Sequence, residues 1–404
     1  MTLAKGPHHL AIPGPSIIPD RVQRAMHRAS PNIYEGELVD ITQSLIRDLK
    51  TLANCKGDVA IYHGNGHAVW EASLCNLFSV GDRIMILDTG RFGQSWGLMA
   101  TTLGLDVVSL EFARDSQVDV EKLAEALQAD SSHEIKAVLT VQTDTSTSSS
   151  NDIAAIRGAI DVAEHPALLM VDAIASFGCE PFDMEAVGAD VFLSASQKGL
   201  MTPPGVALLF VSDRVWALHE SAGLNTPYWD ILPRVRPAMF PDHFCGTPPT
   251  HHLYGLREAV DMILEEGIVN VWNRHRIHAQ CVWAAVDAWS LGGEIKCLIP
   301  NSDDRSLAVT AVSTSAGDAI RLRQWCEQQV GVTLGVGLGA SATRGIVDNV
   351  FRIGHMGHLN PPTLLGVLAC IDAGLKSLDI PHGPSALDAA SQILSESISR
   401  HPPE

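Results

Sequence analysis

Lys198 follows an apolar, strand-like run, where a charged side chain is unusual. The residues before it, ADVFLSAS, alternate bulky apolar and small side chains, which is typical of a strand that ends inside a fold. The Pro-Pro-Gly that follows at 203–205 cannot continue a helix and fixes a turn. Lysine is rarely buried without a function, and burial should lower its pKa because it disfavours the charged form. Lys198 is therefore a candidate nucleophilic amine that exchanges its proton near neutral pH.

A glycine-rich loop and a carboxylate stand at the ends of two other strand-like runs. In HGNGHAVW (63–70), Gly64 and Gly66 bracket Asn65 where a helix is predicted to begin, so that backbone amides could cradle a phosphate. The loop is neither Gly-x-Gly-x-x-Gly nor a Walker loop, which disfavours dinucleotides and nucleoside triphosphates. Asp172 ends the apolar run LLMV, where a carboxylate is costly unless it meets a cation or a donor. Taken singly, the loop could be a plain helix-capping turn and Asp172 a helix N-cap.

Lys198, Asp172 and the glycine loop together fit one cofactor. Pyridoxal 5′-phosphate needs a lysine to form a Schiff base with its aldehyde, an acidic partner for its ring nitrogen, and amide donors for its phosphate. In open α/β sheets, ligands bind beyond the carboxyl ends of the strands, and all three features follow strand-like runs. These residues therefore predict a pyridoxal phosphate site.

The composition is that of a globular protein and excludes several classes. Of the 404 residues, 46% are hydrophobic and 18% charged, and the formal net charge of −18 argues against a nucleic-acid partner. The eight cysteines form no Cys-x-x-Cys pair, so we predict no metal site and reduced thiols. The first residues lack the apolar stretch of a signal peptide, and no run of about eighteen apolar residues occurs. We therefore expect a cytoplasmic protein with no membrane partner.

Strand-like and helix-like stretches alternate along most of the chain. Apolar runs predict buried strands at 58–63, 82–88, 136–142, 167–173, 190–196 and 205–212. Segments of helical period separate several of them, at 67–78, 95–104, 119–130 and 152–165. This alternation indicates an α/β fold with a mainly parallel, doubly wound sheet. Beyond residue 270 a long helical region leads into short strands and a final helix, which indicates a smaller second domain.

Longer motifs resemble one enzyme family over nearly the whole chain. HPALLMVDAIASF, GADVFLSASQKGLMTPPGVAL and GLGASATRGIVDNVFRIGHMGHLN are similar to stretches of class V (fold type I) aminotransferases of the alanine–glyoxylate and serine–glyoxylate group. The resemblance implies a large pyridoxal phosphate domain at 21–270 with a mainly parallel, seven-stranded sheet, and a small C-terminal α/β domain at 271–404. It also implies a homodimer with shared active sites, in which residues 1–20 form an arm that packs on the partner subunit.

The resemblance implies a role for each residue near the reacting atoms. Lys198 is the Schiff-base lysine and the general base that moves a proton from the substrate Cα to the cofactor C4′. Asp172 pairs with the pyridinium nitrogen, and Phe92 falls where these enzymes stack an aromatic ring on the cofactor. Arg352 matches the arginine that clamps the substrate carboxylate, for which its planar fork of donors is suited. From the residues alone, Phe92 could equally be ordinary core and Arg352 a surface arginine.

A second set of residues matches the phosphate-binding positions of the family. Gly66, His67 and Gln197 are in this set, and Asn65 completes the loop. Thr247, in CGTPPTHH, matches a threonine that reaches the phosphate of the neighbouring subunit. His67 alone could also be a surface histidine in the first turn of a helix.

The segment QTDTSTS (142–148) departs from the family pattern. Gln142, Asp144 and Ser148 replace His, Glu and Gly of close relatives, while Thr145 and Thr147 keep their hydroxyls. Thr145 is therefore expected to hold the ring hydroxyl of the cofactor.

A second departure lies near the expected substrate. Relatives often carry His-Arg-Ser where this chain has Ile33, Tyr34 and Glu35, and Phe244 replaces a tyrosine directed at the phosphate of the partner. Tyr34 and Glu35 are expected to face the substrate, and their polarity makes a polar or cationic amino donor a hypothesis. The stretch before Arg352 is also longer than in relatives.

These observations predict a dimeric aminotransferase with ping-pong kinetics. Serine, alanine or aspartate donates the amine, and a small 2-oxo acid, glyoxylate or pyruvate, accepts it. The alternatives are a lyase or cysteine desulfurase of the same fold, a pyridoxamine–pyruvate aminotransferase, and a non-enzymatic cofactor-binding regulator. Desulfurases usually carry a histidine before the lysine, where this chain has Gln197.

Overall fold

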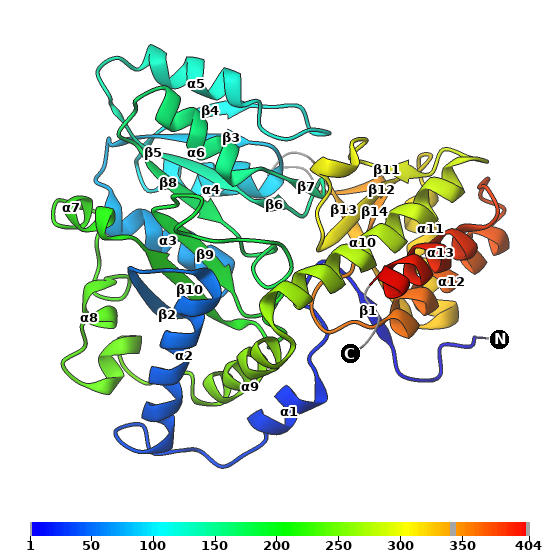
Figure 1. Cartoon of the computed structure of the whole chain (residues 1–404), viewed down its shortest axis with the longest axis horizontal. Helices are drawn as coiled ribbons and strands as arrows, with labels where there is room; N and C mark the ends of the chain where they lie inside the picture. Colours follow the sequence, from blue (N-terminus) through cyan, green and yellow to red (C-terminus); the bar gives the residue numbers. More distant parts are fainter. Residues whose placement is uncertain (1, 340–344, 401–404) are drawn as a thin grey trace.

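A seven-stranded sheet forms the centre of the larger part of the chain (Figure 1). The structure is a computed structural model that describes residues 2–339 and 345–400. The strand order is β2-β10-β9-β8-β5-β3-β4, in which β10 runs antiparallel to both neighbours and the other adjacent pairs are parallel. The strands are β2 (Asp58–Gly64), β3 (Arg83–Asp88), β4 (Asp106–Glu111), β5 (Ile135–Val141), β8 (Leu168–Asp172), β9 (Val191–Ala195) and β10 (Gly205–Val211). The mainly parallel, seven-stranded sheet predicted from the sequence is confirmed.

Most strands of this sheet carry apolar side chains on both faces, so both faces must be shielded from water. Helices cover each face. Successive residues of β3 show the apolar character of both faces, since Met85 and Leu87 belong to one buried cluster and Ile84 and Ile86 to the other. The first cluster lies under α2 (Glu37–Ala53), α5 (Val120–Ala129), α6 (Ile153–Val162) and α9 (Thr250–Glu266). The second lies under α3 (Gly66–Leu77) and α4 (Arg91–Thr102).

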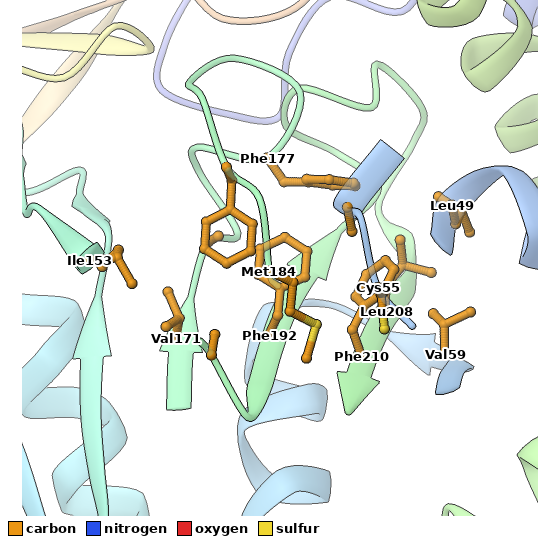
Figure 2. Packing of buried hydrophobic residues seen from close by; sticks show 14 of the residues in the cluster. Leu49, Cys55, Val59, Ile153, Val171, Phe177, Met184, Phe192, Leu208 and Phe210 are labelled. Carbon is orange, nitrogen blue, oxygen red and sulfur yellow. The ribbon is translucent and has the colours of Figure 1, made fainter. Parts of the chain in front are cut away.

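Three phenylalanines pack together in the first cluster, where Figure 2 shows them beside Met184. The ring centroids of Phe192 in β9 and Phe210 in β10 lie 4.9 Å apart, and Phe177 approaches Phe192 to 5.0 Å. Phe177 lies five residues after Asp172, in the turn segment that follows β8. Phe192 lies in β9, and Lys198 is in the turn that follows this strand. This aromatic packing therefore holds together the two chain segments from which Asp172 and Lys198 emerge.

A second, five-stranded sheet forms the smaller part of the molecule, with strand order β1-β13-β14-β12-β11 (Figure 1). Its strands are β1 (His9–Ala11), β11 (Lys296–Cys297), β12 (Val309–Ser313), β13 (Val332–Leu338) and β14 (Ile346–Gly354). The helices of this part are α11 (Asp318–Trp325), α12 (Pro361–Ser377) and α13 (Ala386–Arg400), and they bury a third apolar cluster against the sheet. The long helix α10 (Ile268–Ser290) leads into it from α9.

The beginning of the chain contributes to the small part. Residues 9–11 form the edge strand β1, which pairs in parallel with β13 of the same chain. The small part therefore contains more than the range 271–404 that the sequence indicates. Contact of the arm 1–20 with a partner subunit stays a prediction. Among the described residues, no helix has the length and apolar character needed to cross a membrane.

The remaining helices are short. They are α1 (Asp20–Met26), α7 (Trp216–His219), α8 (Leu232–Val235) and the 3₁₀ turns η1 (Asp213–Val215), η2 (Phe240–Phe244) and η3 (Ser302–Asp304). A π-helical segment, Cys326–Val330, extends α11.

A short hairpin, β6 (Thr143–Asp144) and β7 (Ser149–Ser150), joins the two parts of the molecule. Ser148 at its turn accepts from Ser306 N through its carbonyl at 3.0 Å and from Ala311 N through its hydroxyl at 3.0 Å. The buried Glu180 accepts from the hydroxyls of Thr143 and Ser306 at 2.8 and 2.7 Å. These bonds set the position of the hairpin against the small sheet.

Candidate active site

A cavity of about 220 Å³ lies at the carboxyl ends of β5, β8 and β9. It is lined by Asn65, Gly66, His67, Trp70, Phe92, Val141, Thr143, Thr145, Asp172, Ile174, Ala175, Gln197 and Lys198. Most of the residues singled out from the sequence are therefore brought together from distant parts of the chain. This is the edge of the sheet at which α/β folds bind ligands.

Lys198 follows β9 and is partly buried at the wall of the cavity. Burial lowers the pKa of its amine to about 8, and the nearby cation of Arg352 acts in the same direction, while the carboxylate of Asp172 opposes it. The Lys198 amine donates a hydrogen bond to the carbonyl of Pro13. The lowered pKa has the direction and cause that the sequence predicts.

The N-terminal segment forms one wall around this lysine, which sequence reasoning missed. Ser16 donates its hydroxyl to the Lys198 carbonyl at 2.7 Å and its backbone N–H to the Gln197 carbonyl at 2.9 Å. A Cβ on Gly14 would lie 2.5 Å from the Lys198 Nζ. The motif IPGPS at 12–16 was visible as a run of turn-forming residues, but nothing local pointed to its distant partner.

Asp172 ends β8 with both carboxylate oxygens occupied by donors. Oδ1 accepts from the backbone N–H of Ile174 at 2.7 Å, and Oδ2 accepts from the indole Nε1 of Trp70 at 2.8 Å. Burial raises the pKa of the carboxyl to about 7, although these two hydrogen bonds act against the rise. Trp70 is a second residue that the sequence did not assign, and its only signal was its place one turn into the helix after Gly66.

The glycine loop opens helix α3 as predicted. The side chain of Asn65 caps the helix by accepting from His67 N at 3.1 Å. A Cβ on Gly66 would lie 2.4 Å from Ile174 Cδ1, so glycine lets Ile174 pack closely at this point. Burial lowers the pKa of His67. The Oε1 of Gln197 is buried and has no hydrogen-bond partner among the described residues.

Asp144 sets the start of helix α4 and so the position of Phe92. Its Oδ2 accepts from Phe92 N at 2.8 Å, and its Oδ1 accepts from Ser146 N at 2.9 Å. A Cβ on Gly90 would overlap the Asp144 carboxylate, so the carboxylate fills the space beside that glycine. Asp144, which stands where the family pattern has glutamate, thus accepts directly from a backbone N–H in the first turn of α4.

Arg352 reaches the hairpin from strand β14 and is only 7% exposed. Its Nε donates to the Val336 carbonyl and its Nη1 to the Thr145 carbonyl, both at 2.7 Å. Burial lowers the pKa of its guanidinium to about 10, and Asp144 opposes this change. Arg352 does not itself line the cavity but bonds the carbonyl of Thr145, which does, and it is not a surface arginine.

Five predicted site residues do not line the cavity within this chain, namely Arg352, Thr247, Tyr34, Glu35 and Gly64. Thr247 is exposed in the loop between η2 and α9. Tyr34 is 72% exposed and Glu35 is also exposed, both just before α2. Gly64, the last residue of β2, adjoins the cradle without lining it. Phe244 is buried, with its ring centroid 6.3 Å from that of His63.

The sequence model of the family described as aminotransferase class-V matches residues 24–360. The chain belongs to this family. A serine–glyoxylate aminotransferase of Methylorubrum extorquens is 37% identical over an alignment that covers 98% of each chain. An L-aspartate–glyoxylate aminotransferase of Paracoccus denitrificans is 33% identical over 92% of this chain and 91% of the relative. The crystal structure of a pyridoxamine–pyruvate aminotransferase from Mesorhizobium loti superposes with a TM-score of 0.87 at 25% identity, over 98% of this chain and 100% of that one.

Class V aminotransferases are pyridoxal phosphate enzymes, and the residues of this cavity fit that cofactor. The amine of Lys198, with its lowered pKa, and the carboxyl of Asp172, whose pKa is raised to about 7, line one cavity. The start of α3 supplies backbone amides at Gly66, where a side chain would press on Ile174. The Gln197 amide has an unused polar end, and rotation of the amide exchanges Oε1 with the Nε2 donor that a phosphate needs. No described group of His, Cys, Asp and Glu could hold a metal ion.

Proposed function

We propose that this class V aminotransferase binds pyridoxal 5′-phosphate and transfers the amine of a small amino acid to glyoxylate in a ping-pong reaction. The observation that carries the proposal is that Lys198, whose pKa burial lowers to about 8, lines one cavity with Asp172 and the glycine loop. The names of relatives that match almost end to end support glyoxylate as the acceptor and serine or aspartate as the donor.

Different residues of the cavity hold different parts of the cofactor. The bound cofactor supplies an aldehyde that reacts with amines and a protonated ring that withdraws electrons from the substrate Cα. Asp172 pairs with the ring nitrogen, Phe92 packs on the ring, and the hydroxyl of Thr145 holds the ring hydroxyl. Gly66 N, His67 and the Gln197 amide hold the phosphate.

Lys198 and Arg352 act on the substrate. With a pKa of about 8, a useful fraction of Lys198 is the neutral amine near neutral pH, so it can take the proton from the substrate Cα and return it. Arg352 is held in place by two backbone carbonyls, and no described residue bonds its Nη2. That side of the guanidinium is suited to the substrate carboxylate.

The proposal extends to a homodimer with shared sites. The exposed Thr247 reaches the phosphate of the partner subunit, and Tyr34 and Glu35 face the substrate there. The proposed large domain covers about 21–270, and the proposed small domain is 271–404 together with β1, while the arm 1–20 also packs on the partner. If Glu35 selects a polar or cationic donor, Glu35→Gln changes the relative rates of neutral and basic donors; unchanged preferences reject this role.

A half-reaction screen tests the function. The cofactor-loaded protein is mixed with one amino acid at a time, without acceptor, while its visible absorbance is followed. We expect serine, alanine or aspartate to bleach the colour and glyoxylate to restore it. Release of ammonia or sulfide without restoration would instead identify a lyase or desulfurase. Conversion by free pyridoxamine and pyruvate, without conversion by amino acids, would identify the pyridoxamine–pyruvate reaction.

A further inference from the structure

Trp70 connects the phosphate end of the cavity to the ring-nitrogen end. It lies one turn into α3, after the glycine loop, and is 1% exposed. Its indole N–H donates to Asp172 Oδ2 at 2.8 Å, while Ile174 N donates to Oδ1 at 2.7 Å. The carboxylate is thereby held in one rotamer by a donor on each oxygen.

We propose that Trp70 is a positioning residue, which orients the Asp172 carboxylate and keeps it ionised for the ring nitrogen of the cofactor. The inference rests on the proposed function, and it adds a residue that acts on the cofactor through Asp172. An ionised and correctly oriented carboxylate is what a protonated ring nitrogen requires as its partner.

The electrostatics of the cavity explain why Asp172 depends on such a donor. Burial raises the pKa of Asp172 to about 7, and the negative charge of Asp144 from β6 adds to the rise. The bonds from Ile174 and Trp70 lower the pKa, as does the cation of Lys198. His67, on the same helix as Trp70, has its own pKa lowered by burial. Without the indole donor, Asp172 would therefore be protonated over more of the neutral range.

The neighbouring Trp96 provides a matched comparison within the same apolar cluster. Its ring stacks on that of Trp70, with centroids 6.1 Å apart and planes inclined by 14°. Both indoles are buried, but the Nε1 of Trp96 has no hydrogen-bond partner among the described residues. Trp70→Phe and Trp96→Phe therefore remove similar amounts of buried ring, and Trp70→Phe also removes the donor to Asp172.

The binding test uses cofactor-free protein and pyridoxamine 5′-phosphate, whose affinity is measured by equilibrium dialysis across the neutral pH range. In the wild type, affinity should rise as Asp172 ionises around pH 7. In Trp70→Phe the midpoint should move upward by about one pH unit, and affinity at pH 7 should therefore fall by roughly fivefold. Trp96→Phe should keep the wild-type midpoint. Equal midpoints for the two variants overturn the inference and leave the proposed function standing.

A second readout needs neither cofactor nor a folded Trp70 variant. In protein with ¹⁵N-labelled tryptophan, the indole N–H signal of Trp70 should shift with a midpoint close to pH 7 in the cofactor-free wild type. Asp172→Asn should abolish that pH dependence and leave the Trp96 signal unchanged. A Trp70 signal that does not respond to pH overturns the inference. Absence of pyridoxamine 5′-phosphate binding by the wild type, together with a titrating indole, rejects the proposed function instead.

Discussion

Gly14 lies directly against the amine of Lys198, although the two residues are far apart in the sequence. A Cβ on Gly14 would lie 2.5 Å from Nζ, and the neighbouring Pro13 carbonyl accepts the hydrogen bond of that amine. The φ of Gly14 is +97°, a backbone conformation that residues with a side chain rarely adopt. Pro13 and Gly14 thus pack against the Lys198 side chain, and the lack of a side chain on Gly14 leaves room for the lysine amine.

Gly14→Ala should displace Lys198 and reduce covalent loading with pyridoxal phosphate at least about tenfold, because a 2.5 Å contact cannot be kept. Loading is measured by borohydride reduction of the lysine-bound cofactor and mass analysis of the Lys198 peptide. Gly81→Ala is the matched control, since Gly81 has a φ of +89° and a methyl group placed there would meet nothing within 4 Å. The control should lose about 1 kcal/mol of unfolding free energy and load normally. Equal loading of both variants contradicts the role of Gly14.

The reactivity of Lys198 should follow its lowered pKa. Only the neutral amine attacks an aldehyde, so the rate of pyridoxal phosphate attachment to cofactor-free protein should rise with pH and level off above about 8. Arg352→Gln removes a cation that lowers the pKa of Lys198, and should therefore move the midpoint upward. Asp172→Asn removes an anion that raises it, and should move the midpoint downward. A wild-type midpoint near that of free lysine would refute the effect of burial.

Arg352→Lys should reduce recognition of the substrate carboxylate and leave cofactor loading unchanged. A lysine amine cannot donate to the carbonyls of Val336 and Thr145 and also present a planar fork to a carboxylate. The preference for serine over ethanolamine, which lacks the carboxylate, should fall on the order of a hundredfold in the half-reaction. The ratio of the two bleaching rates measures it directly. A preserved ratio would mean that another residue binds the carboxylate.

The sequence was most informative where a residue type is unusual for its local setting. Lys198 and Asp172 interrupt apolar strand ends, and Gly66 opens a helix, so each could be recognised without knowledge of its neighbours. The sheet was predictable for a similar reason, since apolar runs alternate with helical periods. Trp70 was not recognisable, because an aromatic residue on an apolar helix face is normally core, and here it is core and donor at once. Gly14 could not be paired with Lys198, because a local pattern records no contact between residues so far apart in the sequence.

Asp144 should be needed as a carboxylate, and not only for its shape. Its two oxygens accept from Phe92 N, Ser146 N and the Ser146 hydroxyl, so both oxygens face donors. Asp144→Asn places an NH₂ group against at least one of these donors, whichever way the amide is turned. We expect it to lower the free energy of unfolding by about 2 kcal/mol, measured by urea denaturation.

Asp152→Asn provides the control for this change. Asp152 is exposed and caps α6 through a single bond from Ala155 N at 3.0 Å, a role that asparagine fills equally well. Its free energy of unfolding should therefore stay within about 0.5 kcal/mol of the wild type. If both variants lose the same free energy of unfolding, the loss comes from removing a capping charge and not from the donors around Asp144. If only Asp144→Asn loses stability, the loss comes from the buried donors that face the Asp144 carboxylate. These donors hold the first turn of α4, and therefore Phe92, at the cavity.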